Sequence, residues 1–183
     1  KNYDRLIEIY EALAAHGYRE VGQEYLQNVL DTAKQLDAYD SGRIYYYLGE
    51  YQKAYLALDE ARDKGGADSY LYLGRAYAAT GDYNHASSVY NNYLSKQGPN
   101  AEIYNELGLC EMAKKEYQNA LAAFQAGKQI EGNSLMQTLC FNEIVAYEYL
   151  EDYQQAEVLM NAYLQNYPDD QTAIREQQFL STR

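Results

Sequence analysis

The stretch GDYNHA at residues 81–86 decides the fold, because close variants of it recur along the chain. GEYQKA stands at residues 49–54, KEYQNA at 115–120 and EDYQQA at 151–156. The tyrosines of these four hexads are 32, 34 and 36 residues apart, and an alanine follows each of them three positions later. A nearly constant period of this length is typical of small structural units that stack on their neighbours.

The residues around the hexads have the spacing of packed helices. Four positions after each alanine, helical periodicity places a large residue on the same face, at Leu58, Tyr90, Phe124 and Met160. Glycine stands where the turn between two helices is expected, at Gly17, Gly49 and Gly81. Pro99 and Pro168 follow two of the second helices, where a helix must end. The sequence therefore predicts antiparallel helix pairs.

This pattern resembles the tetratricopeptide repeat, a helix-turn-helix unit of about 34 residues. Residues 67–100 match it best, with Tyr70 in the place where the family usually has Trp. The matching positions that follow are Leu73, Gly74, Tyr77, Ala86, Tyr90 and Pro99. The alternative, unrelated amphipathic helices in a globular bundle, does not explain the regular period.

The resemblance covers nearly the whole chain and implies an all-α fold. We expect a right-handed α-solenoid of about five tetratricopeptide-like helix-turn-helix repeats that form a single domain, 1–183. The expected repeats are 3–34, 35–66, 67–100, 101–136 and 137–170, with a capping helix at 171–183. Repeat four departs from the family pattern, because Glu111 stands where an aromatic residue is usual and about two extra residues lie near Gly132.

The composition shows how the core must be built. The chain has 23 Tyr but only 3 Phe and no Trp, so the flat faces of tyrosine rings must join alanine and leucine in the core. Thirteen tyrosines fall at the packing positions of the repeat: Tyr10, Tyr45, Tyr51, Tyr70, Tyr77, Tyr83, Tyr90, Tyr93, Tyr104, Tyr117, Tyr147, Tyr153 and Tyr163. Most of the tyrosine excess is therefore a packing feature.

Charge and hydropathy exclude several functions. The net charge is −12 and the basic residues form no run, so we expect no nucleic-acid partner. No apolar stretch approaches the roughly 20 residues that span a bilayer, so we expect no direct membrane insertion by this segment. The chain begins at Lys1, which suggests that an upstream segment was removed. The sequence leaves the compartment open: we expect a cytoplasmic protein, or an extracytoplasmic one if an N-terminal leader was removed.

The sequence offers little for catalysis or metal binding. His16 and His85 are far apart, and neither has a cysteine or carboxylate at metal-ligand spacing. Cys110 and Cys140 lie among apolar neighbours, and we expect both to be buried and inert. No phosphate-binding glycine loop is present. We therefore expect no catalytic residue, no metal and no cofactor, and a protein that is not an enzyme.

In the tetratricopeptide family, the first helix of each repeat lines a concave groove that usually holds a peptide or a helix. The resemblance implies that the equivalent residues here bind the partner: Tyr39, Arg43, Tyr46, Tyr47, Tyr72, Arg75, Asn105, Phe141, Asn142 and Tyr149. Arg43 and Arg75 hold equivalent places in successive repeats, and guanidinium groups beside tyrosine rings can grip a carboxylate or peptide carbonyls. Alternatively, Asp40 and Asp68 simply neutralise the two arginines.

The C-terminal part is strongly acidic. Residues 129–174 contain eight acidic residues and no Lys or Arg, which accounts for −8 of the net charge. Such a surface favours a basic partner, although it also serves solubility. Repeats that clamp the C-terminal carboxylate of chaperones carry Lys and Asn in their first repeat. Ile7 and Glu11 stand in those places here, so a clamp of that kind is not expected.

We therefore expect a non-enzymatic scaffold that binds a peptide or protein segment in its groove, as a monomer or weak homodimer. Two alternatives remain open on the sequence. The chain could be a structural or self-assembling module, or the recruiting or regulatory part of a larger, membrane-anchored protein.

Overall fold

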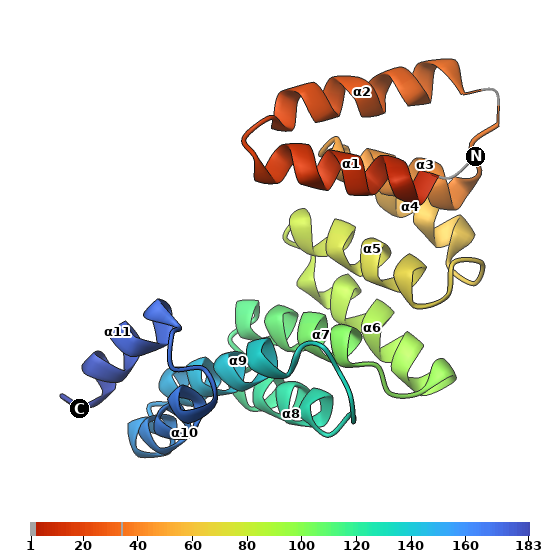
Figure 1. Ribbon diagram of the computed structural model, residues 1–183. Helices are drawn as coiled ribbons and strands as arrows, with labels where there is room; N and C mark the ends of the chain where they lie inside the picture. The colour runs from red at the N-terminus through yellow and green to blue at the C-terminus, as the bar shows by residue number, and fades with distance from the viewer. Residues whose placement is uncertain (1–2, 34) are drawn as a thin grey trace. The chain divides into compact units, whose positions relative to one another are not determined.

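The computed structural model describes residues 3–33 and 35–183, and over these residues the chain forms eleven α-helices and no strand (Figure 1). In chain order they are α1 (Tyr3–Ala15), α2 (Arg19–Thr32), α3 (Ala38–Tyr47), α4 (Tyr51–Ala61), α5 (Gly66–Ala79), α6 (Tyr83–Gln97), α7 (Ala101–Ala113), α8 (Tyr117–Lys128), α9 (Met136–Tyr149), α10 (Tyr153–Asn166) and α11 (Gln171–Leu180). The expected all-α, helical-repeat fold is confirmed.

The helices belong to two compact units, Lys1–Val89 and Tyr90–Arg183, which we call unit 1 and unit 2. Helix α6 contributes residues to both. In unit 1, α1 packs on α2 and α3 on α4, and each second helix also packs on the next first helix, α2 on α3 and α4 on α5. Unit 2 continues this order from α7 to α11. Such sequential packing is that of a solenoid. The repeat boundaries and the capping role of residues 171–183 stay predictions.

One turn geometry joins the paired helices. The first residue of each hexad has a positive φ, +80° at Gly49, +82° at Gly81, 65° at Lys115 and 61° at Glu151. In each turn, the next backbone N–H donates to the carbonyl oxygen five residues earlier, at 2.9 or 3.0 Å. This is a Schellman closure, which satisfies a carbonyl that the end of the first helix leaves open. The tyrosine of each hexad then begins the second helix, at α4, α6, α8 and α10.

Two of these turns hold a residue other than glycine, and replacing either with glycine is expected to stabilise the chain. A residue with a side chain is destabilised by roughly 1–2 kcal/mol in the left-handed region, and glycine avoids this strain. Glycine also has more conformational freedom in the unfolded chain, which opposes the gain by about 0.5–1 kcal/mol. We expect Lys115→Gly and Glu151→Gly to raise the free energy of unfolding by about 0.5–1 kcal/mol each. Urea unfolding followed by far-UV circular dichroism measures this. Gly81→Ala is the matched reverse change, and it must destabilise the chain for the argument to hold.

The alanine of each hexad is small because two helices cross there. Ala54, Ala86, Ala120 and Ala156 are all fully buried, as are the large residues four positions later. Larger apolar clusters then join successive helices. In unit 1, Leu6, Tyr10, Leu26 and Ile44 belong to one cluster, which connects α1, α2 and α3. In unit 2, a second cluster connects α9, α10 and α11 and consists of Ile144, Ala156, Met160, Tyr163, Ala173 and Leu180.

The tyrosines at packing positions are buried to different degrees. Tyr10, Tyr70, Tyr90 and Tyr163 are buried, whereas the other nine of the thirteen are partly buried. The physical reason is that a tyrosine can pack its ring while the hydroxyl group reaches water or a polar partner. The Tyr70 hydroxyl, for example, donates to Asp63 Oδ1 at 3.0 Å.

The missing aromatic residue of the fourth repeat is replaced by an ion pair. Glu111 is 6% exposed, and Lys114 Nζ donates to its two carboxylate oxygens at 2.8 and 3.0 Å. The extra residues before α9 form a turn around Asn133. The Asn133 side chain donates to the Ile130 carbonyl at 2.6 Å and accepts from the Leu135 N–H at 3.1 Å. Local polar contacts therefore absorb both departures from the repeat pattern.

Candidate functional site

Arg43, which the sequence places among the partner-binding residues, lies on α3 with only 5% of its surface exposed. Its Nη1 donates to Asp4 Oδ1 at 2.6 Å and its Nη2 to Asp40 Oδ1 at 2.5 Å. The guanidinium carbon lies 4.2 Å from the centroid of the Tyr39 ring. Burial raises the pKa of Tyr39 to about 12 against the opposing charge of Arg43. Arg43 thus pairs with Asp40, as expected if the neighbouring aspartate neutralises it, and also with Asp4. Both partners belong to unit 1.

Tyr46, Tyr47 and Tyr72 meet in a group of rings that also includes Tyr10 and Tyr51, which we call the tyrosine cluster. Ring centroids are 4.9 Å apart for Tyr10 and Tyr47, 5.3 Å for Tyr46 and Tyr47, and 5.6 Å for Tyr46 and Tyr72. The angles between ring planes, 54°, 76° and 70°, are those of tilted and edge-to-face pairs. Because Tyr46 and Tyr47 come from α3 and Tyr72 from α5, the cluster joins successive first helices.

The hydroxyl groups of the tyrosine cluster are tied to one another. Tyr47 donates a short hydrogen bond to Glu11 Oε1 on α1, and its hydroxyl lies 3.0 Å from that of Tyr72. Burial first, and then the bond to Glu11, raise the pKa of Tyr47 above its ordinary value. Burial also raises the pKa of Tyr72, and the nearby positive charge of Arg75, itself partly buried on α5, opposes that rise. The site residues predicted in unit 1 therefore lie within one neighbourhood.

A pocket of about 300 Å³ opens beside the tyrosine cluster in unit 1. It is lined by Tyr10, Glu11, Ala14, Arg19, Tyr46, Tyr47 and Tyr51. Arg19 was not among the predicted site residues, because it begins the second helix of its pair, which the family pattern assigns to packing. With one acidic and one basic side chain on its wall, this pocket carries no net preference for charge.

In unit 2, Asn105 and Asn142 come from successive first helices and touch. The Asn142 side-chain Nδ2 donates to Asn105 Oδ1 at 2.9 Å, and Asn105 is 7% exposed. Among the described residues, the Asn142 oxygen and the Asn105 nitrogen make no hydrogen bond in return. The Asn142 oxygen on α9 can therefore accept a hydrogen bond, and the Asn105 nitrogen on α7 can donate one. An extended peptide backbone carries both an N–H and a carbonyl group that can bond to them.

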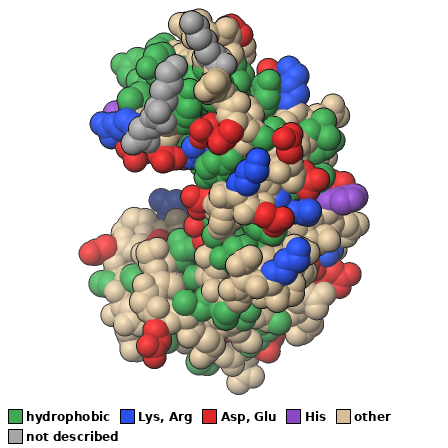
Figure 2. Space-filling model, turned by 90° about the vertical axis from the view of Figure 1, so that its right-hand side faces the viewer, with side chains coloured by type: hydrophobic (Ala, Val, Ile, Leu, Met, Phe, Trp, Pro, Cys, Tyr) green, Lys and Arg blue, Asp and Glu red, His purple; other side chains and the backbone are tan. Residues whose placement is uncertain are grey.

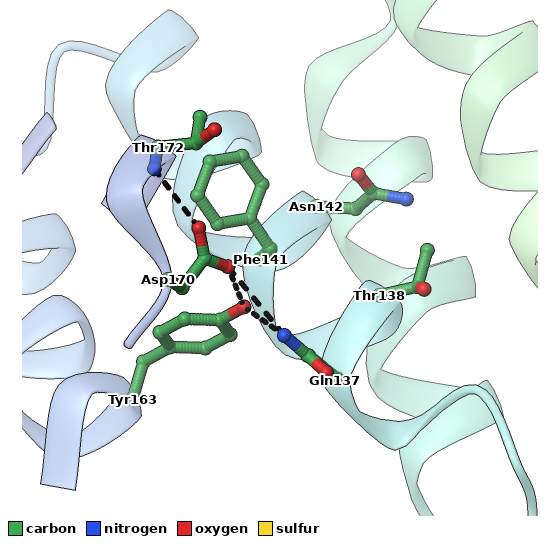
Figure 3. A pocket seen from close by; sticks show the side chains of 7 residues that line it. All are labelled: Gln137, Thr138, Phe141, Asn142, Tyr163, Asp170 and Thr172. Carbon is green, nitrogen blue, oxygen red and sulfur yellow. Dashed lines mark hydrogen bonds between the residues drawn. The ribbon is translucent and has the colours of Figure 1, made fainter. Parts of the chain in front are cut away.

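Next to this amide pair lies a pocket of about 280 Å³, which we call the α9–α11 pocket. Figure 3 shows the Phe141 ring beside Tyr163 and Asp170, with Thr138 and Asn142 of α9 on the side away from those two residues. Phe141 meets Tyr163 edge-to-face, with ring centroids 5.8 Å apart. The lining residues are Gln137, Thr138, Phe141, Asn142, Tyr163, Asp170 and Thr172. The pocket therefore combines an aromatic wall with polar side chains.

The wall of the α9–α11 pocket is fixed by Asp170, the residue before α11. Asp170 Oδ1 accepts from the backbone N–H groups of Thr172 and Ala173 at 3.0 and 3.1 Å, which caps the helix. Its Oδ2 accepts from the Tyr163 hydroxyl at 2.6 Å and from Gln137 Nε2 at 3.5 Å. The bond from Tyr163 and the backbone bonds hold the pKa of Asp170 below its ordinary value. Asp170 is thus a structural anchor that stays ionised.

Sequence reasoning missed Gln137, Tyr163, Asp170 and Thr172 as pocket residues. Tyr163 was assigned to packing, and the last two lie at the start of the segment interpreted as a cap. The sequence did contain a signal for the last two, because an Asp directly before a helical pattern, as at Asp170, is a typical helix start. It indicates where α11 begins and therefore which residues lie at that end of the helix.

Tyr149 is separate from the α9–α11 pocket. It is 57% exposed at the end of α9 and stacks on Tyr117 of α8, with ring centroids 5.0 Å apart. Of the four residues predicted in unit 2, the structure brings Asn105, Phe141 and Asn142 together and leaves Tyr149 in this exposed pair.

The acidic excess of residues 129–174 is only partly a surface feature. Glu143 is 5% exposed, accepts from Gln125 Nε2 at 2.9 Å and forms a short ion pair with Lys128 of α8. The expectation of an open acidic surface is therefore wrong for Glu143, because its helix position turns it towards α8. On the face drawn in Figure 2, Asp and Glu side chains are interspersed with Lys and Arg.

Whereas Glu143 is paired with Lys128, Glu148 forms no ion pair with any residue that the structure describes. Its Oε1 is buried and makes no hydrogen bond within the described part of the chain. Burial, and then the negative charge of Glu176 on α11, raise the pKa of Glu148 to about 7. Glu148 therefore lies close enough to α11 for the charge of Glu176 to act on it, and its buried oxygen has no partner among the described residues.

The cysteines and histidines lie in separate surroundings. Cys110 is buried and its pKa is raised to about 12 by burial, whereas Cys140 is only partly buried, on the wall of a pocket of about 340 Å³ between α9 and α10. His16 bonds to the Ala12 carbonyl and His85 to Asp82. Residues 3–33 and 35–183 hold no group of three or more His, Cys, Asp or Glu side chains placed for a metal ion. No helix among these residues is long and apolar enough to cross a membrane.

Comparison with known proteins identifies relatives of the fold. The family model for the tetratricopeptide repeat matches residues 39–94 and 73–133, which together span more than half of the chain. No curated protein matches the sequence. Among solved structures, a thermophilic TPR protein from Thermus thermophilus is 16% identical with a TM-score of 0.73, and the match covers 99% of this chain and 100% of that one.

Two further structures are similar. A tetratricopeptide repeat protein from Parabacteroides merdae is 18% identical with a TM-score of 0.68, over 97% of this chain and 72% of that one. The second TPR domain of the human RPAP3 protein, solved in complex with the HSP70 peptide SGPTIEEVD, is 17% identical with a TM-score of 0.58. This match covers 64% of the present chain and 97% of that domain.

Proposed function

Because the chain belongs to the tetratricopeptide repeat family, we propose that it is a non-enzymatic interaction module that binds an extended peptide segment along the first helices of its repeats. The observation that carries this proposal is the Asn105–Asn142 amide pair beside the α9–α11 pocket. An extended peptide has main-chain donors and acceptors that the pair can meet. The pocket receives one of its side chains.

The contacts between first helices support this function. A surface that binds a peptide across several repeats needs side chains from successive first helices to lie in one neighbourhood. Glu11, Tyr47 and Tyr72 do so through their hydrogen bonds in unit 1, and Asn105 and Asn142 do so in unit 2. Because these side chains hold one another, little conformational entropy is lost when a ligand binds.

The peptide in the human RPAP3 complex is acidic at its end, and this chain lacks the features expected to bind such a ligand. Of the two clamp positions, Ile7 is 5% exposed, and Glu11 accepts the Tyr47 hydroxyl. The likeness to that domain supports the fold, and the ligand of the present chain must be sought separately.

The proposal is tested by selecting peptides from a random display library on the full chain and measuring their affinity by fluorescence polarisation. Asn142→Ala removes one of the two amides, and at about 1 kcal/mol for each lost hydrogen bond we expect at least fivefold weaker binding. Asn119→Ala is the matched control, because Asn119 is exposed on α8, outside the first helices.

Both variants are compared with the parent by far-UV circular dichroism, so that a loss of fold is not read as a loss of binding. If no peptide binds the full chain, or if Asn142→Ala and Asn119→Ala bind as tightly as the parent, the proposed function is wrong.

A further inference from the structure

We propose that the segment bound at the α9–α11 pocket is basic, with an apolar side chain that enters beside Phe141 and a Lys or Arg about three residues away that pairs with Glu148 and Glu176. We call Glu148 and Glu176 the carboxylate pair. This inference rests on the proposed function, because it names the chemistry of the segment that the same surface binds.

The positions of the residues on α9 set the spacing. Glu148 follows Phe141 by seven residues, which is close to two full turns, so both lie on one face of the helix. Two turns advance about 10 Å along the axis, and an extended chain covers that distance in about three residues. Helix α11 also runs from the pocket towards Glu148. Thr172 lines the pocket, and Glu176, one turn later, lies close enough for its charge to act on Glu148.

Most other acidic groups near this face are already satisfied. Asp170 accepts four hydrogen bonds as the cap of α11, and Glu143 is paired with Lys128. By contrast, neither Glu148 nor Glu176 forms an ion pair within the described part of the chain, and Glu148 Oε1 is buried without a hydrogen bond. The carboxylate pair is therefore where this surface lacks a positive charge.

The electrostatics favour a cation from outside the chain. Burial and the charge of Glu176 raise the pKa of Glu148 to about 7, so two neighbouring carboxylates oppose each other's ionisation. Residues 129–174 contain no Lys or Arg that could supply this cation. A guanidinium or ammonium group from a partner would relieve this repulsion by pairing with the parts of Glu148 and Glu176 that are only partly buried. An acidic segment would meet both carboxylates and be rejected.

The test uses a synthetic peptide with one Leu in an otherwise uncharged Ser, Gly and Gln background. Arg is placed at each position from five residues before the Leu to five after it, and a parallel series carries Glu instead. Affinities for the full chain are measured by fluorescence polarisation at low and high salt. We expect Arg three residues from Leu, on one side, to bind at least tenfold tighter than Glu at the same place. High salt should reduce this preference.

The Glu148→Gln/Glu176→Gln variant keeps the shape of the carboxylate pair and removes its charge. It should weaken binding of the best Arg peptide about tenfold and leave the affinity of the uncharged Leu peptide within twofold. Glu157→Gln is the matched control, because Glu157 lies on α10 and does not act on the pKa of Glu148. It should leave both affinities unchanged.

The outcomes separate this inference from the proposed function. If peptides bind without a preference for Arg, or if the double variant retains that preference, the basic-segment inference is overturned while peptide binding stands. The same holds if Glu157→Gln weakens the Arg peptide as much as the double variant does, because general charge then explains the effect. If no peptide binds, including those from the display library, the proposed function fails as well.

Discussion

Phe124→Ala is expected to lower the free energy of unfolding of unit 2 by about 3–5 kcal/mol. The Phe124 ring is fully buried on α8 and packs where α7 carries Gly108. A methyl group on Gly108 would overlap that ring, so the two residues fill one space. Truncating the ring leaves a cavity that the close-packed helices cannot fill.

Urea unfolding followed by far-UV circular dichroism measures the loss for Phe124→Ala, and hydrogen exchange locates it in unit 2, since a repeat array can unfold in parts. Phe179→Ala is the matched control, because Phe179 is 39% exposed on α11, and it should cost less than about 1 kcal/mol. Gly108→Ala should cost about 1–3 kcal/mol by overpacking, and less when combined with Phe124→Leu. Equal losses for Phe124→Ala and Phe179→Ala would contradict this account of the core.

Asp40→Ala is expected to destabilise unit 1 by about 2–3 kcal/mol, because it removes a charged hydrogen-bond partner from a buried guanidinium. The Arg43 side chain is 6% exposed and that of Asp40 is 19% exposed. Arg43 Nε is already buried without a hydrogen bond in the described part of the chain, so the loss of Asp40 leaves Asp4 as the remaining carboxylate partner.

Asp4→Ala provides the matched comparison for Asp40→Ala in the same urea measurement. The Asp4 side chain is 71% exposed, so water screens its ion pair and its removal should cost less than about 1 kcal/mol. If Asp4→Ala proves as costly as Asp40→Ala, burial does not determine the strength of these two ion pairs.

The fold could be predicted because the information for it is local and repeated. The hexad alone indicates a turn, a helix start at tyrosine and a crossing at alanine, and Ala54, Ala86, Ala120 and Ala156 are indeed fully buried. Helical periodicity then places Phe124 on the same helix face as Ala120, and Phe124 is also fully buried. Each of these features depends on residues within one repeat.

The candidate site could be predicted only in part, because side-chain partners come from different repeats. Asp40 lies three residues from Arg43, but Asp4 lies 39 residues away, and no local pattern shows that both meet the same guanidinium. Likewise, Lys128 and Glu143 belong to different helices, α8 and α9. The direction in which a long charged side chain turns depends on these neighbours, which periodicity does not specify.

The turn shared by the four hexads does not require glycine at its first position. Its geometry is held by a backbone hydrogen bond, and Lys115 and Glu151 adopt the positive φ that Gly49 and Gly81 adopt. The first position of the hexad can therefore hold a residue other than glycine, at a cost in stability that is confined to one repeat. A repeat of this chain can therefore keep the turn without the glycine that usually marks it, so the backbone hydrogen bond identifies the turn where the residue type does not.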